Sequence, residues 1–253
     1  TAIGMALGAS FAGRLGVCAT SGPGMCLKSE FIGLAAITEL PLVICDIQRG
    51  GPSTGLPTKT EQGDLLQCYF GRNSDLPIPI VAPTSSSDCF FVAREAIRIA
   101  LAYNTPVILL SELYLAIGSE PWRLPDISTF PEISSNVVQP GEKFVIYKRD
   151  PDTLARKVAF PGMAGFEHRV GGLEKDESGE VSYDASNHEK MTCTRVEKVQ
   201  AIAKSLPPTK INGSAGGRLL VLGWGGTYGA ITSAVNRMQS EGFSVSSVVL
   251  RHL

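Results

Sequence analysis

The residues best suited to chemistry lie between positions 19 and 65, where a glycine-rich turn is followed by a polar loop. The turn reads TSGPG at residues 20–24. Glycines on either side of a proline let the backbone approach a bulky, flat ligand, because no Cβ stands in the way. A helix predicted from about residue 25 to residue 37 would point its free N–H groups at the same turn. The pattern indicates a ligand cradle; a strand-to-helix turn without a ligand is the alternative.

Arg49 is the strongest candidate for binding a substrate, because it directly follows an apolar run that would fix its position as a buried strand. Its planar guanidinium is suited to a two-pronged grip on a carboxylate. The loop after it adds hydroxyl donors and a second cation, at Thr54, Thr58, Lys59 and Thr60. These groups favour an acidic substrate. The alternative is a solvated loop in which Arg49 forms a structural ion pair.

The elements that must position these residues alternate over residues 1–118. Strands are predicted near residues 15–19, 41–46, 78–82 and 106–110, and helices near residues 2–13, 25–37, 62–70 and 86–103. The runs PLVICDI and PVILLS are continuously apolar, which is typical of parallel strands covered on both faces. We therefore predict a doubly wound parallel α/β domain.

The rest of the chain is predicted to form a connection and a second α/β unit. Residues 119–210 are rich in proline, glycine and charge, with a hairpin predicted around residues 176–179 and a helix over residues 192–205. Residues 211–253 contain a strand from Arg218, a glycine-rich turn, a helix over residues 228–241 and a strand over residues 245–250. The uncapped apolar start and strand-like finish predict a fragment of a longer subunit, with the domains 1–118 and 211–253 both cut short.

Composition narrows the range of partners and compartments. The net charge of −1 gives no electrostatic case for a nucleic acid or an anionic membrane as partner. No apolar run approaches the roughly 20 residues that cross a bilayer. The six cysteines are dispersed, which predicts reduced thiols, a cytoplasmic location and no metal or iron–sulfur site in this chain. His168 and His188 match no metal-ligand spacing, so metal binding there is a minor alternative and their role stays open.

Together, these segments resemble the pyrimidine-binding domain of thiamine diphosphate enzymes. Within that group, QRGGPSTGLPTKTEQGDLL at residues 48–66 is similar to the 2-oxoacid:ferredoxin oxidoreductases, most closely the alpha subunit of the 2-oxoglutarate type. Four later segments share the resemblance in the same order: APTSSSDCFFVAREAIRIAL (82–101), TPVILLSELYL (105–115), GFEHRVGGLEKDESGEVSYDASNHEKM (165–191) and VLGWGGTYGAI (221–231). The resemblance implies that the second unit is the start of a transketolase C-terminal-like domain.

The resemblance also implies roles for individual residues. The backbone of Ser21, Gly22, Pro23 and Gly24 would line the pocket for the aminopyrimidine ring of the cofactor. Arg49 and Thr58 would hold the carboxylate end of a 2-oxo acid, and Lys59 a second carboxylate. The catalytic glutamate of the family would lie just upstream of Thr1, so this chain carries none. Glu30 lies on the wrong helix to replace it.

A partner is implied by what this sequence lacks. The family's diphosphate-binding half carries Gly-Asp-Gly and a later Asn, because Mg²⁺ requires oxygen ligands. Here Gly63-Asp64-Leu65 lacks the second glycine, and Asp64 is interpreted as the start of a helix. A beta subunit is therefore expected to supply the Mg²⁺, diphosphate and [4Fe-4S] sites. The implied reaction is oxidative decarboxylation of 2-oxoglutarate or a related 2-oxo acid, with coenzyme A as acyl acceptor and ferredoxin as electron acceptor.

Three alternatives remain at this point. A non-oxidative thiamine diphosphate enzyme, such as an acetolactate synthase or a decarboxylase, shares the TSGPG turn. A NAD-dependent dehydrogenase could use the glycines at residues 223–229, although the expected acidic residue about 20 positions later is missing. A non-catalytic assembly subunit would use the same fold without binding a substrate.

Overall fold

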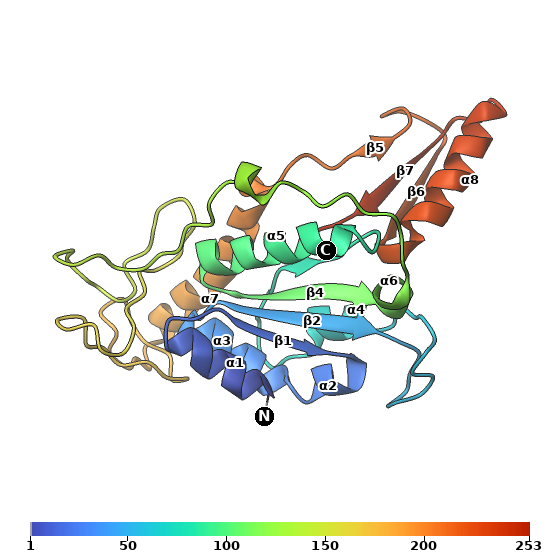
Figure 1. Ribbon diagram of the computed structural model, residues 1–253. Helices are drawn as coiled ribbons and strands as arrows, with labels where there is room; N and C mark the ends of the chain where they lie inside the picture. The colour runs from blue at the N-terminus through green and yellow to red at the C-terminus, as the bar shows by residue number, and fades with distance from the viewer. Residues whose placement is uncertain (1) are drawn as a thin grey trace.

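A parallel sheet forms the centre of the first part of the chain in the computed structural model, which describes residues 2–253 (Figure 1). Its strands are β1 (Gly16–Thr20), β2 (Leu42–Gln48), β3 (Ile80–Val81) and β4 (Pro106–Glu112), in the order β1-β2-β4-β3. The helices between and after them are α1 (Ala2–Phe11), α2 (Gly22–Cys26), α3 (Ser29–Thr38), α4 (Leu65–Phe70), α5 (Asp88–Tyr103) and α6 (Leu113–Ile117). Every residue of β4 is buried, as predicted for its apolar run at residues 106–110, and the polar Ser111 and Glu112 at its end are buried as well.

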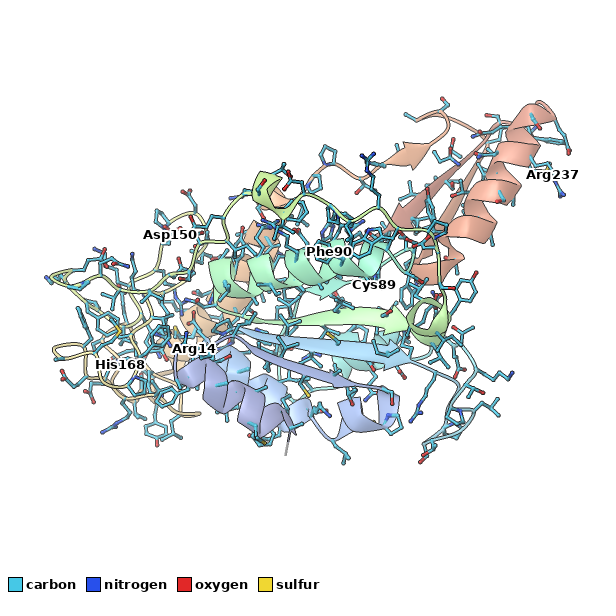
Figure 2. All side chains as sticks on the ribbon, in the orientation of Figure 1. Arg14, Cys89, Phe90, Asp150, His168 and Arg237 are labelled. Atoms are coloured by element: carbon cyan, nitrogen blue, oxygen red, sulfur yellow. The ribbon has the colours of Figure 1, made fainter. Side chains whose placement is uncertain are left out.

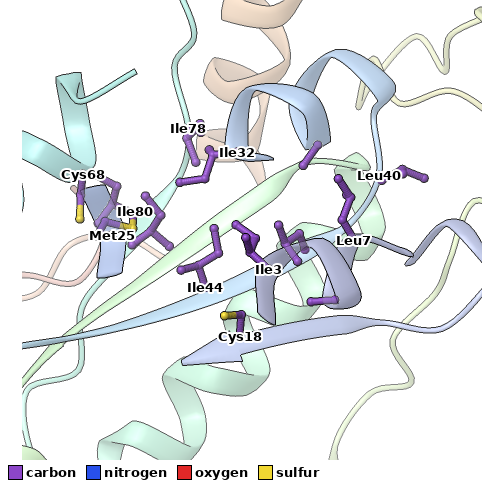
Figure 3. Packing of buried hydrophobic residues seen from close by; sticks show 14 of the residues in the cluster. Ile3, Leu7, Cys18, Met25, Ile32, Leu40, Ile44, Cys68, Ile78 and Ile80 are labelled. Atoms are coloured by element: carbon purple, nitrogen blue, oxygen red, sulfur yellow. The ribbon is translucent and has the colours of Figure 1, made fainter. Parts of the chain in front are cut away.

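Helices cover both faces of this sheet, which confirms the predicted doubly wound fold (Figure 1). Successive side chains of a strand point to opposite faces. Accordingly, Leu42 and Ile44 of β2 pack into one cluster with Ile3 and Ile32, from α1 and α3 (Figure 3). The intervening Val43 packs into a second cluster with residues of α5. Sheet and helices together hold the carboxyl ends of β1, β2 and β4 at one edge.

The prediction for the helix after the TSGPG turn was wrong. The helix expected from about residue 25 starts at Gly22, and it is divided into α2 and α3 at residues 27–28. Pro23 lies in the first turn of α2, where proline is favoured because its fixed φ suits a helix and its missing N–H would have no partner there. The glycines of the TSGPG run therefore open the helix and do not precede it.

The connecting segment contains the short 3₁₀ helices η1 (Ile127–Thr129) and η2 (Ala203–Ser205) and the long helix α7 (Ala185–Ile202). The helix α7 begins earlier than the predicted residue 192, because the Asp184 side chain caps it by accepting a hydrogen bond of 2.9 Å from Asn187 N. The predicted hairpin near residue 177 is present as a turn with one antiparallel bridge, between Lys175 and Val181.

A buried ionic cluster fixes this segment to the first sheet unit. Glu39, which ends α3, accepts hydrogen bonds from Arg149 at 2.7 and 3.0 Å and pairs with Lys198 of α7. Burial opposes ionisation of Glu39, but Lys198 and Arg149 outweigh it and lower its pKa to about 2. Burial lowers the pKa of Lys198 to about 8, even beside Glu39. The cations crowded around one carboxylate thus keep Glu39 ionised, while Arg149 and Arg156 add to the effect of burial on Lys198.

The second α/β unit contains β5 (Ile211–Asn212), β6 (Leu219–Trp224), η3 (Gly225–Thr227), α8 (Tyr228–Ser240) and β7 (Val245–Leu250). The predicted succession of strand, glycine-rich turn, helix and strand is present, and in the described part of the chain the strands follow the order β5-β7-β6, with β6 and β7 parallel. Residues 251–253 return to the first sheet, where Ala82 N donates to Arg251 O at 2.7 Å and Leu253 N to Ile80 O at 2.9 Å. The division of the chain at residues 118 and 210 stays a prediction. Among residues 2–253, no helix has the length and apolarity needed to cross a membrane.

Candidate functional site

The glycine-rich turn lies at the carboxyl end of β1, which pairs with β2. Ser21 has an extended backbone (φ −137°) and caps α2, and its carbonyl accepts a hydrogen bond of 2.9 Å from Met25 N. A Cβ on Gly24 would overlap the hydroxyl of Thr20, and one on Gly22 would stand 2.7 Å from Asp64 Oδ1. Packing within the chain therefore requires both glycines, and the turn presents mainly backbone.

A buried carboxyl group, Asp46 on β2, and a half-buried one, Asp64 at the start of α4, lie beside this turn. Burial and the neighbouring Asp64 raise the pKa of Asp46 to about 6, and Cys68 Sγ donates to Asp46 Oδ2 at 3.5 Å. Burial and Glu61 raise the pKa of Asp64, while the backbone of Gly22 opposes this rise. Asp46 Oδ1 and Asp64 Oδ2 have no hydrogen-bond partner within residues 2–253. Asp46 was not predicted as a site residue, although a carboxylate inside the apolar run LVICDIQ was a signal.

Arg49 directly follows β2, as expected, and its side chain is half-buried. Its Nε is buried and has no hydrogen-bond partner among the described residues. None of the ion pairs formed within residues 2–253 includes Arg49. The alternative of a structural ion pair is therefore not observed, and a buried donor is left for a ligand to satisfy.

The loop beyond Arg49 is closed at its base and open to solvent at its tip. Gly50 N donates to Lys59 O at 2.9 Å, and Leu56 N donates to Gly50 O at 2.8 Å. Residues 51–60 are all exposed, so the side chains of Thr58 and Lys59 reach into solvent. Backbone bonds thus fix the position of Thr58 and Lys59 while their side chains stay free to meet an incoming molecule.

Gln48, the last residue of β2, ties together the two ends of this loop. Its side chain is fully buried, and its Nε2 donates to Ser111 O at 3.0 Å. Its Oε1 accepts a hydrogen bond of 3.0 Å from Asp64 N. Gln48, just before Arg49, therefore bonds both to the neighbouring strand β4 and to Asp64, just after the loop. This role was not predicted from the sequence.

The glycine-rich turn after β6 is occupied by a carboxylate of the same chain. Gly226 N donates to Glu112 Oε1 at 2.7 Å, and Gln62 Nε2 donates to Trp224 O at 3.0 Å. Burial raises the pKa of Glu112, although hydrogen bonds from Gly226 and Gln62 oppose this. A dinucleotide would need the free N–H groups of this turn for its diphosphate. The geometry therefore disfavours the dehydrogenase alternative.

The histidines of the connecting segment lie away from this edge. Figure 2 shows His168 among the loops at the opposite end of the molecule from α6. His168 Nδ1 lies 2.8 Å from Phe166 O, and His188 Nδ1 lies 2.8 Å from Glu174 Oε1. Glu30, in the first turn of α3, is exposed. The structure does not bring these residues together with Arg49 or the TSGPG turn.

These residues fit one side of a thiamine diphosphate site. A turn of backbone and small side chains at the end of a parallel strand suits the edge and face of a flat ring. Beside this turn, Asp46 and Asp64 each have one carboxylate oxygen without a hydrogen-bond partner among the described residues. Residues 2–253 contain no group of three or more His, Cys, Asp or Glu side chains placed to hold a metal ion.

A parallel α/β fold with this half-site defines a class of thiamine diphosphate-binding domains. The family model described as pyruvate flavodoxin/ferredoxin oxidoreductase, thiamine diphosphate-binding, matches residues 1–186. The chain belongs to this family, which confirms the family suggested by the sequence and its thiamine diphosphate-binding fold.

The individual relatives have more specific names than the family. The chain is 51% identical over 250 residues to the 2-oxoglutarate oxidoreductase subunit KorA of Mycobacterium tuberculosis, covering 98% of this chain and 38% of that protein. It is 34% identical to the 2-oxoglutarate synthase subunit KorA of Methanothermobacter marburgensis, covering 95% of this chain and 64% of that protein. A solved structure of 2-oxoglutarate:ferredoxin oxidoreductase from Magnetococcus marinus, with 2-oxoglutarate, coenzyme A and succinyl-CoA bound, superposes with a TM-score of 0.93 at 33% identity, covering 98% of this chain and 44% of that one. The chain thus spans 38%, 64% and 44% of these three proteins, which is less than two thirds of each.

Proposed function

We propose that this chain supplies the pyrimidine side of the cofactor site and the substrate loop of a 2-oxoacid:ferredoxin oxidoreductase alpha subunit. The reaction is oxidative decarboxylation of 2-oxoglutarate with coenzyme A, giving an acyl-CoA and reduced ferredoxin. One observation carries the proposal: the TSGPG turn and the unpaired Arg49 follow the carboxyl ends of two strands that pair directly, β1 and β2. The names of these relatives and the 2-oxoglutarate bound in the similar structure support the choice of 2-oxoglutarate.

Each part of the chain has a distinct role in this proposal. The guanidinium of Arg49 binds the carboxylate next to the keto group, and its unpaired Nε gives it a donor for that purpose. The Thr58 hydroxyl adds a neutral donor, and Lys59 pairs with the distal carboxylate. The backbone of residues 21–24 positions the aminopyrimidine ring. Binding both charged ends of the substrate fixes the bond between the keto carbon and the departing carboxylate.

Thiamine diphosphate, when bound, accepts the negative charge that carbon dioxide leaves behind, a task that protein side chains do not perform. This chain contributes orientation and charge neutralisation. We assign the Mg²⁺, diphosphate and [4Fe-4S] sites to a partner beta subunit, because the described residues hold no suitable ligand cluster. A cytoplasmic location is in keeping with the cysteines of the described chain, all of which are free.

The test is an assay of the complete complex with 2-oxoglutarate, coenzyme A, thiamine diphosphate and Mg²⁺. We expect ferredoxin or a low-potential dye to be reduced only when coenzyme A is present, with one acyl-CoA formed per two electrons. Release of carbon dioxide without reduction of an acceptor would instead indicate a non-oxidative thiamine diphosphate enzyme.

A further inference from the structure

Glu112 makes a contact between the two α/β units that the proposed chemistry does not use. It is the last residue of β4, and its side chain is buried at the edge where the strands end. Its Oε1 accepts a hydrogen bond of 2.7 Å from Gly226 N, 114 positions later in the chain. Gln62 makes a parallel contact by donating to Trp224 O at 3.0 Å across 162 positions. Two side chains of the first unit thus hold one turn of the second.

The turn is shaped to receive these two side chains. Gly225 has a φ of +65°, and a Cβ there would stand 2.6 Å from Gln62 Nε2. A Cβ on Gly226 would overlap Glu112 Oε1. Any larger residue would push the turn away from Glu112 or Gln62. The glycines after β6 are therefore explained by an intramolecular contact and need no bound nucleotide.

The same contact reaches the loop that carries Arg49. Gln62 lies near the end of that loop, and Gln48 lies immediately before it. Gln48 and Glu112 face each other in the register of β2 and β4. The hydrogen bond from Asp64 N to Gln48 Oε1 fixes the residue two positions after Gln62. The loop is consequently held at both ends. The hydrogen bonds of Gln62 and Glu112 to the turn after β6 connect the later of these ends to the second unit.

We propose that Glu112 and Gln62 form an interdomain latch that holds the Arg49 loop in its substrate-binding position. Both are positioning residues, since they act through Arg49 and touch no reacting atom. This inference rests on the proposed role of Arg49 in binding the 2-oxo acid. It assigns the second unit a function in substrate binding, because displacing its glycine turn would release the loop.

The test compares Glu112→Ala, Glu112→Gln and Gln62→Ala in the complete complex, with Glu197→Gln as a control at an exposed carboxylate. Glu112→Ala leaves Gly226 N–H without its acceptor, and we expect the KM for 2-oxoglutarate to rise about tenfold while kcat changes less than about twofold. Glu112→Gln keeps an acceptor oxygen and should restore a KM close to that of the unmodified enzyme. Gln62→Ala should raise KM in the same sense as Glu112→Ala.

Amide hydrogen exchange provides a second readout that does not depend on activity. Peptides covering residues 49–62 and 223–228 should both exchange faster in Glu112→Ala and Gln62→Ala than in Glu197→Gln. A lower melting temperature with unchanged KM and unchanged exchange of residues 49–62 would overturn the latch and leave Glu112 a purely structural residue. If the unmodified complex does not turn over 2-oxoglutarate, the proposed function fails; the exchange data then decide about the latch independently.

Discussion

Replacing Asp46 by Asn should stabilise the protein at neutral pH. Asp46 is fully buried, one of its oxygens has no partner within residues 2–253, and burial beside Asp64 raises its pKa from 3.8 to about 6. A shift of this size corresponds to roughly 3 kcal/mol at about 1.4 kcal/mol per unit. Asn is neutral and nearly the same shape, and its amide oxygen can still accept from Cys68. The variant should therefore recover much of that free energy.

The sign of the pH dependence is fixed by the direction of the shift. Because the folded pKa is raised, the native state keeps a proton that the unfolded chain loses between pH 3.8 and about 6. The stability of the unmodified protein thus falls as pH rises through this window. Above it, the full free-energy penalty of ionising the buried Asp46 is present. We expect Asp46→Asn to gain up to about 3 kcal/mol at pH 7.5 and almost nothing at pH 4.

Thermal unfolding of the complete subunit at pH 4, 5.5 and 7.5 measures this difference. A gain of 3 kcal/mol would raise the melting temperature by roughly 5–10 °C at pH 7.5. Asp75→Asn, at an exposed carboxylate, is the matched control and should change the melting temperature little. Two results would contradict this prediction: destabilisation of the protein by Asp46→Asn at pH 7.5, or a change in melting temperature that is the same at every pH.

Two further predictions concern the cofactor and the substrate. Isothermal titration of residues 1–253 with thiamine diphosphate and Mg²⁺ should show binding weaker than micromolar, because the described residues offer no metal-ligand cluster; micromolar binding would mean that the diphosphate site is in this chain. Lys59→Met in the complete complex should lower kcat/KM for 2-oxoglutarate and narrow its advantage over pyruvate, since an unpaired cation beside a methyl group costs about 1–3 kcal/mol. An unchanged ratio of the two kcat/KM values would make Lys59 a surface residue without a role in selecting the substrate.

Local patterns predicted the scaffold well. The unbroken apolar runs in β2 and β4 indicated parallel strands covered on both faces, and the position of Arg49 after β2 followed from that alone. The start of α2 was missed because Gly-Pro-Gly was interpreted as a turn, although proline also favours the first turn of a helix.

The buried polar network could not be predicted in the same way. Gln48 bonds to Ser111 across 63 positions and Glu112 to Gly226 across 114, and neither leaves a periodic signal in the sequence. Glu112 is the last residue of an apolar strand, where a carboxylate usually marks the exposed end. Here it contacts Gly226 of the second unit, and that approach depends on the whole fold. The residues that hold the site are thus harder to predict than those that face a ligand.

The most direct test of the account is the kinetics of Arg49→Lys in the complete complex. Lysine keeps the positive charge but loses the two-pronged geometry and the Nε donor. We predict that the KM for 2-oxoglutarate rises by about tenfold or more, that kcat changes less, and that the affinity for thiamine diphosphate is unchanged. An unchanged KM together with weaker cofactor binding would contradict the account, because it would place Arg49 in the cofactor site and leave the substrate carboxylate without its proposed partner.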